Sequence, residues 1–375
     1  MSRKAAHMPA ASTAHTSSRI ISIDPLADQR WERFVSTHPD ALVFHHPTWL
    51  RALEEAFDYQ PVHLACEDGD GQLRGVLPLF ALHGVVTGHR FSSLPRTPLA
   101  GPLTRDRETA RALLGAAVER VRAVPGAQLQ FKLASDTLSG LVEDVVAARW
   151  RQSYQVDLPE RPDQLRFGSG RNQARLRWAI KKAARLGVVA REAESEADLR
   201  RWYAVYLETM RWYFVPPRPY HFFEQVWRGL RPHGMLRLLL AERYTASGVT
   251  LLAGSLFLMY GKTVFYTFNG RRREYLGFRP NDALQWKAIH EACAAGYQYY
   301  DLGEVTSDHS SLADFKSKWG ATPHWLYRYY YPAPNEVEIG IMESQNWAGN
   351  LLHATWKRLP LSATVALSDW AHRHF

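Results

Sequence analysis

Two carboxylates and a lysine near the C-terminal end have the side-chain types that a group-transfer reaction needs. Asp301 and Glu304 end a short aromatic segment, and Lys316 follows shortly after them. A carboxylate can accept the proton that an attacking amine loses, or it can hold an ammonium group in place. A desolvated and well-aimed ammonium can stabilise a developing oxyanion by about 3 kcal/mol. Such residues are also common as turn caps and on protein surfaces, so the pattern alone does not assign a reaction.

The elements that must position these residues are a helix, a strand and a turn. Apolar residues recur at helical spacing from Asn281 onward, and Gly296 supplies the left-handed conformation that ends the helix. The pattern then predicts a short strand over 297–304 and a lysine-bearing turn over 315–320. The start of a helix exposes backbone N–H groups that attract anions, so this order suits a transferase with an anionic donor. The same order of elements also occurs in many other α/β proteins.

Several segments of the chain resemble FemAB-like proteins, a branch of the GNAT superfamily of N-acyltransferases. In the C-terminal half these segments are 279–281, 296–297, 301–303, 315–320 and 326–331. In the N-terminal half they are 44–50, 75–79, 92–95 and 100–102. The resemblance covers about residues 20–332. It implies an α/β protein of two tandem GNAT-like domains, each a twisted mixed β-sheet flanked by helices.

The order of predicted elements supports two such units. Residues 20–158 form the predicted N-terminal domain, in which helices and strands alternate and the last helix lies near 139–149. Residues 159–332 form the predicted C-terminal domain, which begins with a basic connecting helix over 171–187. Residues 1–19 lack the apolar core of a signal peptide, and we expect them to form a disordered lead-in.

The resemblance also implies roles for the three residues introduced first. Phe315 and Lys316 are similar to a Phe-Lys pair that precedes a glycine turn close to the family's reacting groups. Lys316 would therefore stabilise the oxyanion. Glu304 would assist loss of the amine proton or hold the acceptor's ammonium form. Asp301 has the same chemical options, and its alternative role is to cap the turn over 306–310.

Further residues of the C-terminal half are candidates for substrate binding. Tyr266 and Asn269 lie on or just after the strand where GNAT folds place their donor edge, although a packed tyrosine and a turn asparagine are common alternatives. Arg279 and Asn281 flank the start of the predicted helix, and Trp319 follows the lysine. We expect these side chains to surround the bound substrate.

The helix predicted over 171–187 carries a second set of candidates. The residues expected to bind substrate phosphate are Arg171, Arg175, Lys181 and Lys182. Guanidinium groups form forked hydrogen bonds with phosphate oxygens. Asp163 is the only acid between 161 and 191, so pairing with acids four residues away does not explain these charges. A solvated helix face remains the alternative explanation.

The acyl donor is left open by a departure from the family pattern. GNAT acetyltransferases usually carry a glycine-rich loop that cradles the pyrophosphate of coenzyme A. Residues 273–280 contain one glycine and a proline, which removes a donor N–H group. Either acyl-CoA or aminoacyl-tRNA is therefore expected as the donor substrate, and no tightly bound cofactor is expected.

Composition limits the class of protein. The chain has 375 residues, of which 46% are apolar and 22% charged, as in ordinary globular proteins. A net charge of +9 implies attraction to polyanions. Two cysteines, Cys66 and Cys293, do not suit a disulfide framework or a cysteine metal site, and the scattered histidines lack metal-ligand spacing. No apolar stretch is long enough to span a membrane, so we expect a cytoplasmic protein. Because metal-ligand spacing is lacking, we expect no bound metal.

These expectations combine into one function and one alternative. The resemblance implies N-acyl transfer to an amine of a cell-envelope or exopolysaccharide precursor. The expected partners are a phosphate-bearing acceptor and, for one of the two donors, tRNA. Residues 333–375 form a predicted amphipathic tail that would contact the inner face of the membrane. The alternative is a noncatalytic protein that binds nucleic acid or a membrane surface through the basic helix and this tail.

Overall fold

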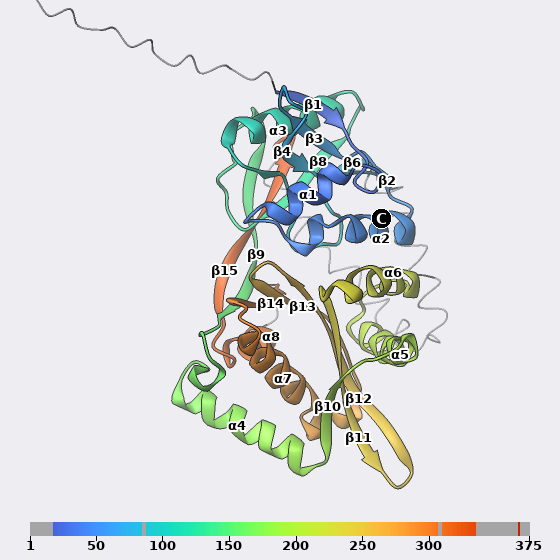
Figure 1. The fold of residues 1–375 in the computed structure, drawn as a ribbon, viewed down its shortest axis with the longest axis vertical. Coiled ribbons are helices and arrows are strands. Elements are labelled where there is room, and N and C mark those ends of the chain that lie inside the picture. The colour runs from blue at the N-terminus through green and yellow to red at the C-terminus, as the bar shows by residue number, and fades with distance from the viewer. Residues whose placement is uncertain (1–17, 85–87, 307–309, 335–366, 368–375) are drawn as a thin grey trace, which may run out of the picture.

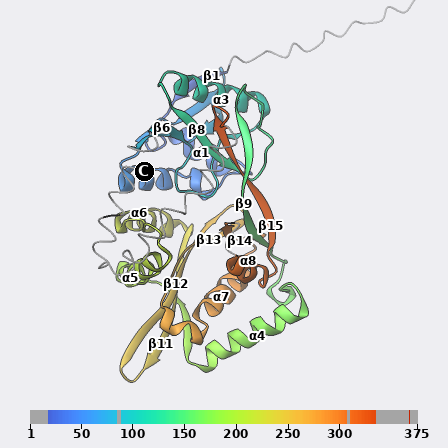
Figure 2. The same cartoon turned by 180° about the vertical axis from the view of Figure 1, so that it is seen from behind.

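The computed structural model describes residues 18–84, 88–306, 310–334 and 367. The predicted lead-in and tail therefore lie almost entirely outside the described residues. Within the described part, the chain forms two α/β lobes (Figure 1). Two long neighbouring strands, β9 (Val146–Asp157) and β15 (Thr322–Tyr331), run from one lobe into the other, as the view from behind also shows (Figure 2).

The N-terminal lobe has its own small sheet, with all neighbouring strands antiparallel. In spatial order these strands are β1 (Arg19–Ser22), β3 (Leu64–Glu67), β4 (Leu73–Leu77) and β7 (Leu103–Thr104). The helices of this lobe are α1 (Gln29–Thr37), the short 3-10 helix η1 (Val43–His45), α2 (Pro47–Phe57) and α3 (Arg107–Arg122).

A second sheet of eleven strands continues through both lobes. In spatial order its members are β10 (Val188–Glu192), β11 (Leu236–Thr245), β12 (Gly248–Tyr260), β13 (Thr263–Arg271), β14 (Tyr299–Val305), β9, β15, β8 (Gln128–Leu133), β6 (Gly88–Ser92), β5 (Phe80–Gly84) and β2 (Gln60–Pro61). Neighbours are antiparallel except for the parallel pairs β6–β8 and β13–β14. Because β15 pairs with both β8 and β9, a strand from near the end of the described chain completes the N-terminal lobe.

The prediction of a helix near 139–149 is wrong. The chain there forms turns and then enters β9, which pairs with β14 on one side and β15 on the other. Leucine, alanine and glutamate give this segment local helix propensity, but pairing along two neighbouring strands outweighs such a preference. The short strand β10 was not predicted either.

The other predicted helices agree with the structure to within a few residues, because their caps and apolar faces are strong signals. The helices of the second half are η2 (Pro162–Gln164), α4 (Gly170–Arg185), α5 (Glu196–Tyr213), α6 (Tyr220–Leu230), η3 (Arg231–His233), η4 (Arg273–Phe278), α7 (Pro280–Ala294) and α8 (Ser310–Ser317). Ser169 caps α4 by accepting from the Asn172 N–H, and Ser195 caps α5 by accepting from the Asp198 N–H.

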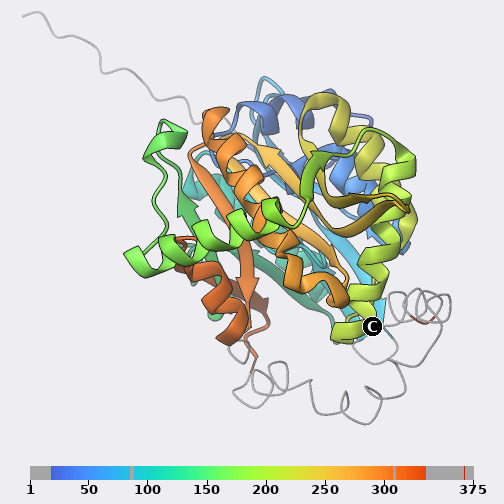
Figure 3. The same ribbon diagram turned by 90° about the horizontal axis from the view of Figure 1, so that it is seen from below.

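Helices cover both faces of the sheet in the second lobe. On one face α5 packs on β12 and β13, with α6 beside it. On the other face α7 packs on β10, β11 and β12, and α4 lies outside α7, as the view from below shows (Figure 3). The basic helix α4 is therefore an outer layer of the molecule.

The two lobes share a hydrophobic core where α2 packs on α6. Trp49 of α2 meets Phe222 of α6 edge to face, with 5.2 Å between ring centroids. Phe44 and Phe265 form a second pair across the same contact at 5.5 Å. Aromatic pairs of this kind each stabilise packing by about 1 kcal/mol beyond area burial. The lobes are thus held together by packed aromatic side chains.

Candidate active site

The centre of the candidate site is an irregularity in β14. The ladder between β13 and β14 ends at Phe265 and Asp301, and the register between β14 and β9 shifts between Asp301 and Glu304. Gly303 lies inside this shift with φ of +81°, a left-handed conformation that glycine adopts without strain. A Cβ at this position would lie 3.7 Å from the Lys316 ammonium. The bulge therefore turns β14 toward the lysine.

Lys316 lies in the last turn of α8 and is 3% exposed. The turn predicted over 315–320 forms only over 318–320, and Lys316 itself lies in the helix that ends at Ser317. The ammonium donates to the carbonyl oxygens of Gly303 at 2.8 Å and Glu304 at 3.0 Å. Burial lowers the pKa of Lys316 to about 8, against the opposing effect of the Asp301 and Glu304 charges. An ammonium carries three protons, so one remains for a ligand.

Asp301 is buried behind the lysine and is held by the bulge itself. Its carboxylate accepts from the Ser153 hydroxyl at 2.9 Å and from the Gly303 N–H at 2.5 Å. Burial raises the pKa of Asp301, while these two hydrogen bonds and the Lys316 charge oppose the increase. Asp301 thus shapes the bulge and supplies negative charge to Lys316, which is a positioning role.

Glu304 is the carboxylate that is placed to meet a substrate. One oxygen accepts from the Arg151 guanidinium at 2.7 Å, and the side chain is 26% exposed. The other oxygen, Oε2, is buried and has no hydrogen-bond partner among the described residues. Unpaired buried carboxylate oxygens are rare and point to a missing partner. Glu304 can therefore accept a hydrogen bond from an amine at Oε2 while Arg151 holds Oε1.

A group of cations around Glu304 was not predicted from the sequence. The cluster, which we call the junction cluster, contains Glu304 and the three cations that interact with it: Lys132 on β8, Arg151 on β9 and Arg328 on β15. It also includes Arg218, between α5 and α6, which interacts with Lys132, and Arg90 on β6, which interacts with Arg328. Lys132 and Arg328 are direct partners across the β8–β15 ladder. Like charges placed directly opposite one another destabilise a sheet. The cluster therefore contains unfavourable charge that the fold alone does not require.

Burial adds to the electrostatic cost of the junction cluster. Burial lowers the pKa of Lys132 to about 8. The charge of Glu304 opposes this decrease in pKa, whereas the charges of Arg328, Arg151 and Arg218 add to it. Burial is also the main cause of the lowered pKa values of Arg90 and Arg328. Two buried atoms, Nε of Arg90 and Nη1 of Arg218, have no hydrogen-bond partner among the described residues. Cations in this state favour an anionic ligand.

A loop with unusual backbone conformations holds two of these cations. Leu94 and Arg96 have φ of +52° and +61°, which is uncommon for residues other than glycine. The Lys132 ammonium donates to the Thr97 carbonyl at 2.5 Å, and the Arg218 guanidinium donates to the Arg96 carbonyl. Arg218 also lies over the rings of Phe222 and Phe268, at 4.5 and 5.2 Å. Such backbone conformations cluster at ligand-binding sites.

The predicted donor-edge residues lie on β13 beyond the point where it leaves β14. Burial is the main cause of the raised pKa of Tyr266, which lies beside Ser255 and Gln285. Asn269 accepts from the Ser255 hydroxyl at 3.2 Å. The amide nitrogen of Gln285 is buried without a partner among the described residues. These polar groups lie along the part of β13 that β14 does not pair.

The remaining candidates of the C-terminal half lie around the start of α7. Arg279 has φ of +62° and lies 5.2 Å from the Trp178 ring, and the Asn281 side-chain oxygen is buried without a described partner. Trp319 is fully buried and packs edge to face on Phe167 at 5.3 Å. Its role in binding substrate stays a prediction.

The four predicted phosphate-binding residues of α4 are not brought together with Lys316. Arg171, Arg175 and Lys181 are exposed and Lys182 is half-buried, all on the side of α4 away from α7. No described hydrogen bond or ion pair joins them to the lysine site. All cations of the junction cluster except Arg218 come from strands, where single basic residues give little signal in the sequence.

The family comparison decides what kind of fold carries this site. Residues 170–317 match the family described as acetyltransferase (GNAT) domain. This segment is similar to a GNAT domain. It includes Asp301, Glu304 and Lys316, and it ends one residue after the lysine. No curated protein sequence matches the chain.

Solved structures extend the likeness to most of the chain. FemX has a TM-score of 0.61 and 16% identity, over 87% of this chain and 100% of FemX. The C-terminal domain of a putative lysylphosphatidylglycerol synthetase from Agrobacterium fabrum has a TM-score of 0.52 and 15% identity, covering 85% of this chain and 95% of that one. L-PGS from Bacillus licheniformis has a TM-score of 0.51 and 15% identity, covering 84% and 98%.

These comparisons confirm the predicted fold class and the resemblance to the FemAB-like branch. The chain is an α/β protein with GNAT-like halves, and its large mixed sheet is flanked by helices. Among the described residues, no cluster of histidine, cysteine, aspartate and glutamate could hold a metal ion. None of the helices in the described part is both long and apolar enough to cross a bilayer.

Proposed function

We propose that this protein transfers an acyl or aminoacyl group to an amine of a cell-envelope or exopolysaccharide precursor. The observation that carries the proposal is the buried Lys316 ammonium, which is fixed by two carbonyls of the β14 bulge inside the segment that is similar to a GNAT domain. A buried cation of this kind is costly unless it serves a ligand or a reaction. The fold shared with FemX and L-PGS supports this general chemistry.

In the proposed reaction the acceptor amine attacks the carbonyl carbon of the donor. The carbonyl electron pair moves onto oxygen, and the third N–H of Lys316 donates to that oxyanion. The amine proton passes to Glu304 Oε2, which has no described partner. The oxyanion then reforms the carbonyl and expels the donor's leaving group, a thiolate from acyl-CoA or a ribose oxygen from aminoacyl-tRNA. The leaving group takes up the proton that Glu304 accepted from the amine, which restores the Glu304 carboxylate and balances the charges.

The acceptor in this proposal carries a phosphate group. The junction cluster contains five cations, of which Lys132, Arg151 and Arg328 interact with the Glu304 carboxylate. Lys132 and Arg328 lie opposite one another, which places two positive charges side by side. A phosphate or diphosphate would satisfy them and would orient the amine toward Glu304 and Lys316.

The donor in this proposal lies along β13 and the start of α7. Tyr266, Asn269 and Asn281 provide polar side chains there, and Arg279 provides a cation. Acyl-CoA is the usual donor of GNAT enzymes, and aminoacyl-tRNA is the alternative. Native mass spectrometry of the purified protein after incubation with acetyl-CoA or with alanyl-tRNA distinguishes them by the mass that is retained.

The decisive test is substitution of the lysine. Lys316→Met removes the charge at similar length and should lower the rate of transfer by about 100-fold, as loss of an oxyanion donor does in other enzymes. Mass spectrometry of acylated products from an envelope-precursor fraction gives the rate. Lys262→Met, at an exposed turn, is the matched control and should keep full activity. Undiminished transfer by a folded Lys316→Met variant would show that the proposed chemistry is wrong.

A further inference from the structure

The outer face of α4 carries a continuous ridge of basic side chains around one tryptophan. Residues at intervals of three and four lie on one face of a helix. On α4 such residues are Arg171, Arg175, Trp178, Lys182 and Arg185, and Lys181 lies beside them. We call these six residues together the α4 ridge. The buried residues Leu176, Ala179 and Ala183 form the adjoining face, which packs toward α7. Most of the ridge is exposed, whereas Lys182 is half-buried and Trp178 lies beside Arg279 at the start of α7.

The cations of the α4 ridge have no carboxylate partner among the described residues. No ion pair joins any of its five cations to a carboxylate within the described part of the chain, although arginines elsewhere form many such pairs. An unpaired run of like charge repels itself and is retained where it meets an opposite charge. The five charges thus form a surface that complements a polyanion.

Trp178 shows which polyanion this surface fits. Its side chain is 52% exposed, and the Lys182 ammonium and the Arg279 guanidinium lie over its ring at 5.1 and 5.2 Å. Binding of single-stranded nucleic acid uses free aromatic faces on which bases stack, usually inside a groove. Here cations lie over the ring, and α4 is the outermost layer of its lobe (Figure 3). A tryptophan flanked by cations on an outward ridge suits the headgroup region of a bilayer.

We propose that the α4 ridge docks this protein on a membrane surface rich in anionic phospholipid. The five cations lie against lipid phosphates, and the edge of Trp178 enters the headgroup layer. No described hydrogen bond or ion pair joins the cations of the ridge to Lys316 or to the junction cluster, although Trp178 lies beside Arg279 of the proposed donor site. Docking would bring the enzyme to the plane in which a lipid-linked acceptor resides.

Vesicle sedimentation tests the proposal with the full chain. The vesicles contain equal parts of phosphatidylglycerol and phosphatidylcholine, or phosphatidylcholine alone. The protein should bind the first kind, and raised salt should weaken binding. Arg175→Gln combined with Lys181→Gln should reduce partitioning by about fivefold for each charge removed. Trp178→Ala should weaken binding without changing its salt dependence. Arg111→Gln, on the exposed side of α3, is the matched control.

The outcomes separate this proposal from the others. Vesicle binding that is equal in the wild type and in the Arg175/Lys181 double variant would overturn it, even if the predicted tail binds lipid. Binding of the wild type to tRNA but not to vesicles, with loss in the double variant, would make the ridge a nucleic-acid site and would also overturn it. Lys316→Met should bind vesicles like the wild type, so a failure of the proposed chemistry leaves this result unaffected.

Discussion

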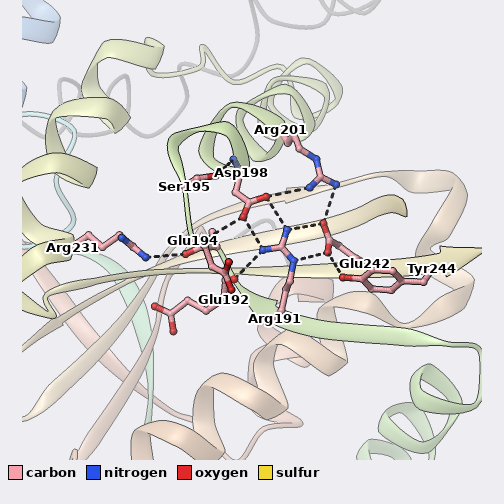
Figure 4. A network of polar contacts seen from close by, with 10 residues as sticks. Arg191, Glu192, Glu194, Ser195, Asp198, Arg201, Arg231, Glu242 and Tyr244 are labelled. Carbon is pink, nitrogen blue, oxygen red and sulfur yellow. Dashed lines mark hydrogen bonds and ion pairs between the residues drawn. The ribbon is translucent and has the colours of Figure 1, made fainter. Parts of the chain in front are cut away.

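Two regions of this protein bury arginines, and they differ in whether each charge is matched. In the first region, β10, α5 and β11 meet around a network of two arginines and two acids (Figure 4). Arg191 donates to Asp198 and to Glu242 at 2.7 Å each, and Arg201 bonds to Glu242 at 2.9 Å. Glu242 is almost completely buried, and Tyr244 donates to it at 3.1 Å. We call this region the paired network.

The junction cluster has the opposite balance. It holds five cations and one carboxylate, Glu304, whose described hydrogen bond is to Arg151. The Arg151 and Arg328 guanidinium groups both lie over the ring of Trp150, at 4.6 and 3.4 Å. Burial lowers the pKa of Arg218 to about 10. In the paired network, by contrast, the hydrogen bond from Arg191 is the main cause that lowers the pKa of Asp198 to about 2.

The difference shows how to separate structural charge from functional charge. A buried ion pair whose groups are all hydrogen-bonded needs no ligand, and breaking it leaves a charge without a partner. A buried cluster with excess charge of one sign is destabilising on its own, and it becomes favourable when an ion of the opposite sign binds. The paired network ties three elements together, whereas the junction cluster is suited to an anionic substrate.

The largest effect on stability is expected in the paired network. Glu242→Gln keeps the shape of the side chain but removes the negative charge between Arg191 and Arg201. We expect the free energy of unfolding to fall by about 3 kcal/mol, because Arg191 and Arg201 lose the charge of an almost completely buried carboxylate. Urea unfolding followed by tryptophan fluorescence measures the change. Glu119→Gln, which alters an exposed ion pair on α3, is the control and should change little. Equal effects of the two substitutions would mean that the paired network is not structural.

A pH dependence of stability is expected from Lys316. Its pKa is about 8 in the folded protein, below its usual value of 10.5. Between these values the unfolded chain binds the proton and the folded protein does not, so stability from this group rises with pH. The wild type should therefore gain up to about 2 kcal/mol relative to Lys316→Met between pH 7 and pH 10. Urea unfolding of both proteins across this range measures the gain.

The control for this measurement is Lys262→Met, which should follow the wild-type curve at every pH. Other groups titrate in the same range, and taking the difference between wild type and variant removes their contribution. Parallel curves for the wild type and Lys316→Met would show that the lysine is solvated in the folded protein. The lysine would then lack the desolvated environment that oxyanion stabilisation requires.

The sequence predicted the elements with strong local signals and the site residues that lie close together in the chain. The helix predicted from Asn281 onward has apolar residues at helical spacing, the strand predicted to end at Glu304 has an aromatic pattern, and both form. Lys316 and Glu304 are joined by one helix and one bulge, so their association follows from a short segment. Periodicity and the family resemblance together were sufficient for this part.

The junction cluster could not be predicted, because its members meet only through long-range pairing. Lys132 and Arg328 are neighbours since β15 crosses into the N-terminal lobe. The mistaken helix near 139–149 concealed β9 and with it the position of Arg151. Arg218 lies between two helices, in a segment without periodicity. A single sequence contains no signal for which distant strands pair, and that pairing decides where these charges collect.

The smallest expected effect on stability has the opposite sign and lies in the junction cluster. Arg90 has a lowered pKa from burial, and its Nε has no described partner. Arg90→Met keeps the apolar stem and removes a guanidinium that lies beside Arg328 and Arg96, so the free energy of unfolding should rise by about 0.5–1 kcal/mol. Urea unfolding measures the gain, with Arg111→Met on the exposed side of α3 as the control.

The same substitution should weaken binding of the anion for which the cluster is suited. Inorganic pyrophosphate is the probe, and calorimetric titration should show about tenfold weaker binding by Arg90→Met, because a charge-assisted hydrogen bond is worth roughly 1.5 kcal/mol. A gain in stability with a loss of pyrophosphate affinity identifies charge that is retained for a ligand. If Arg90→Met instead lowers the free energy of unfolding, Arg90 is a structural charge like those of the paired network. The contrast between the two regions would then no longer hold.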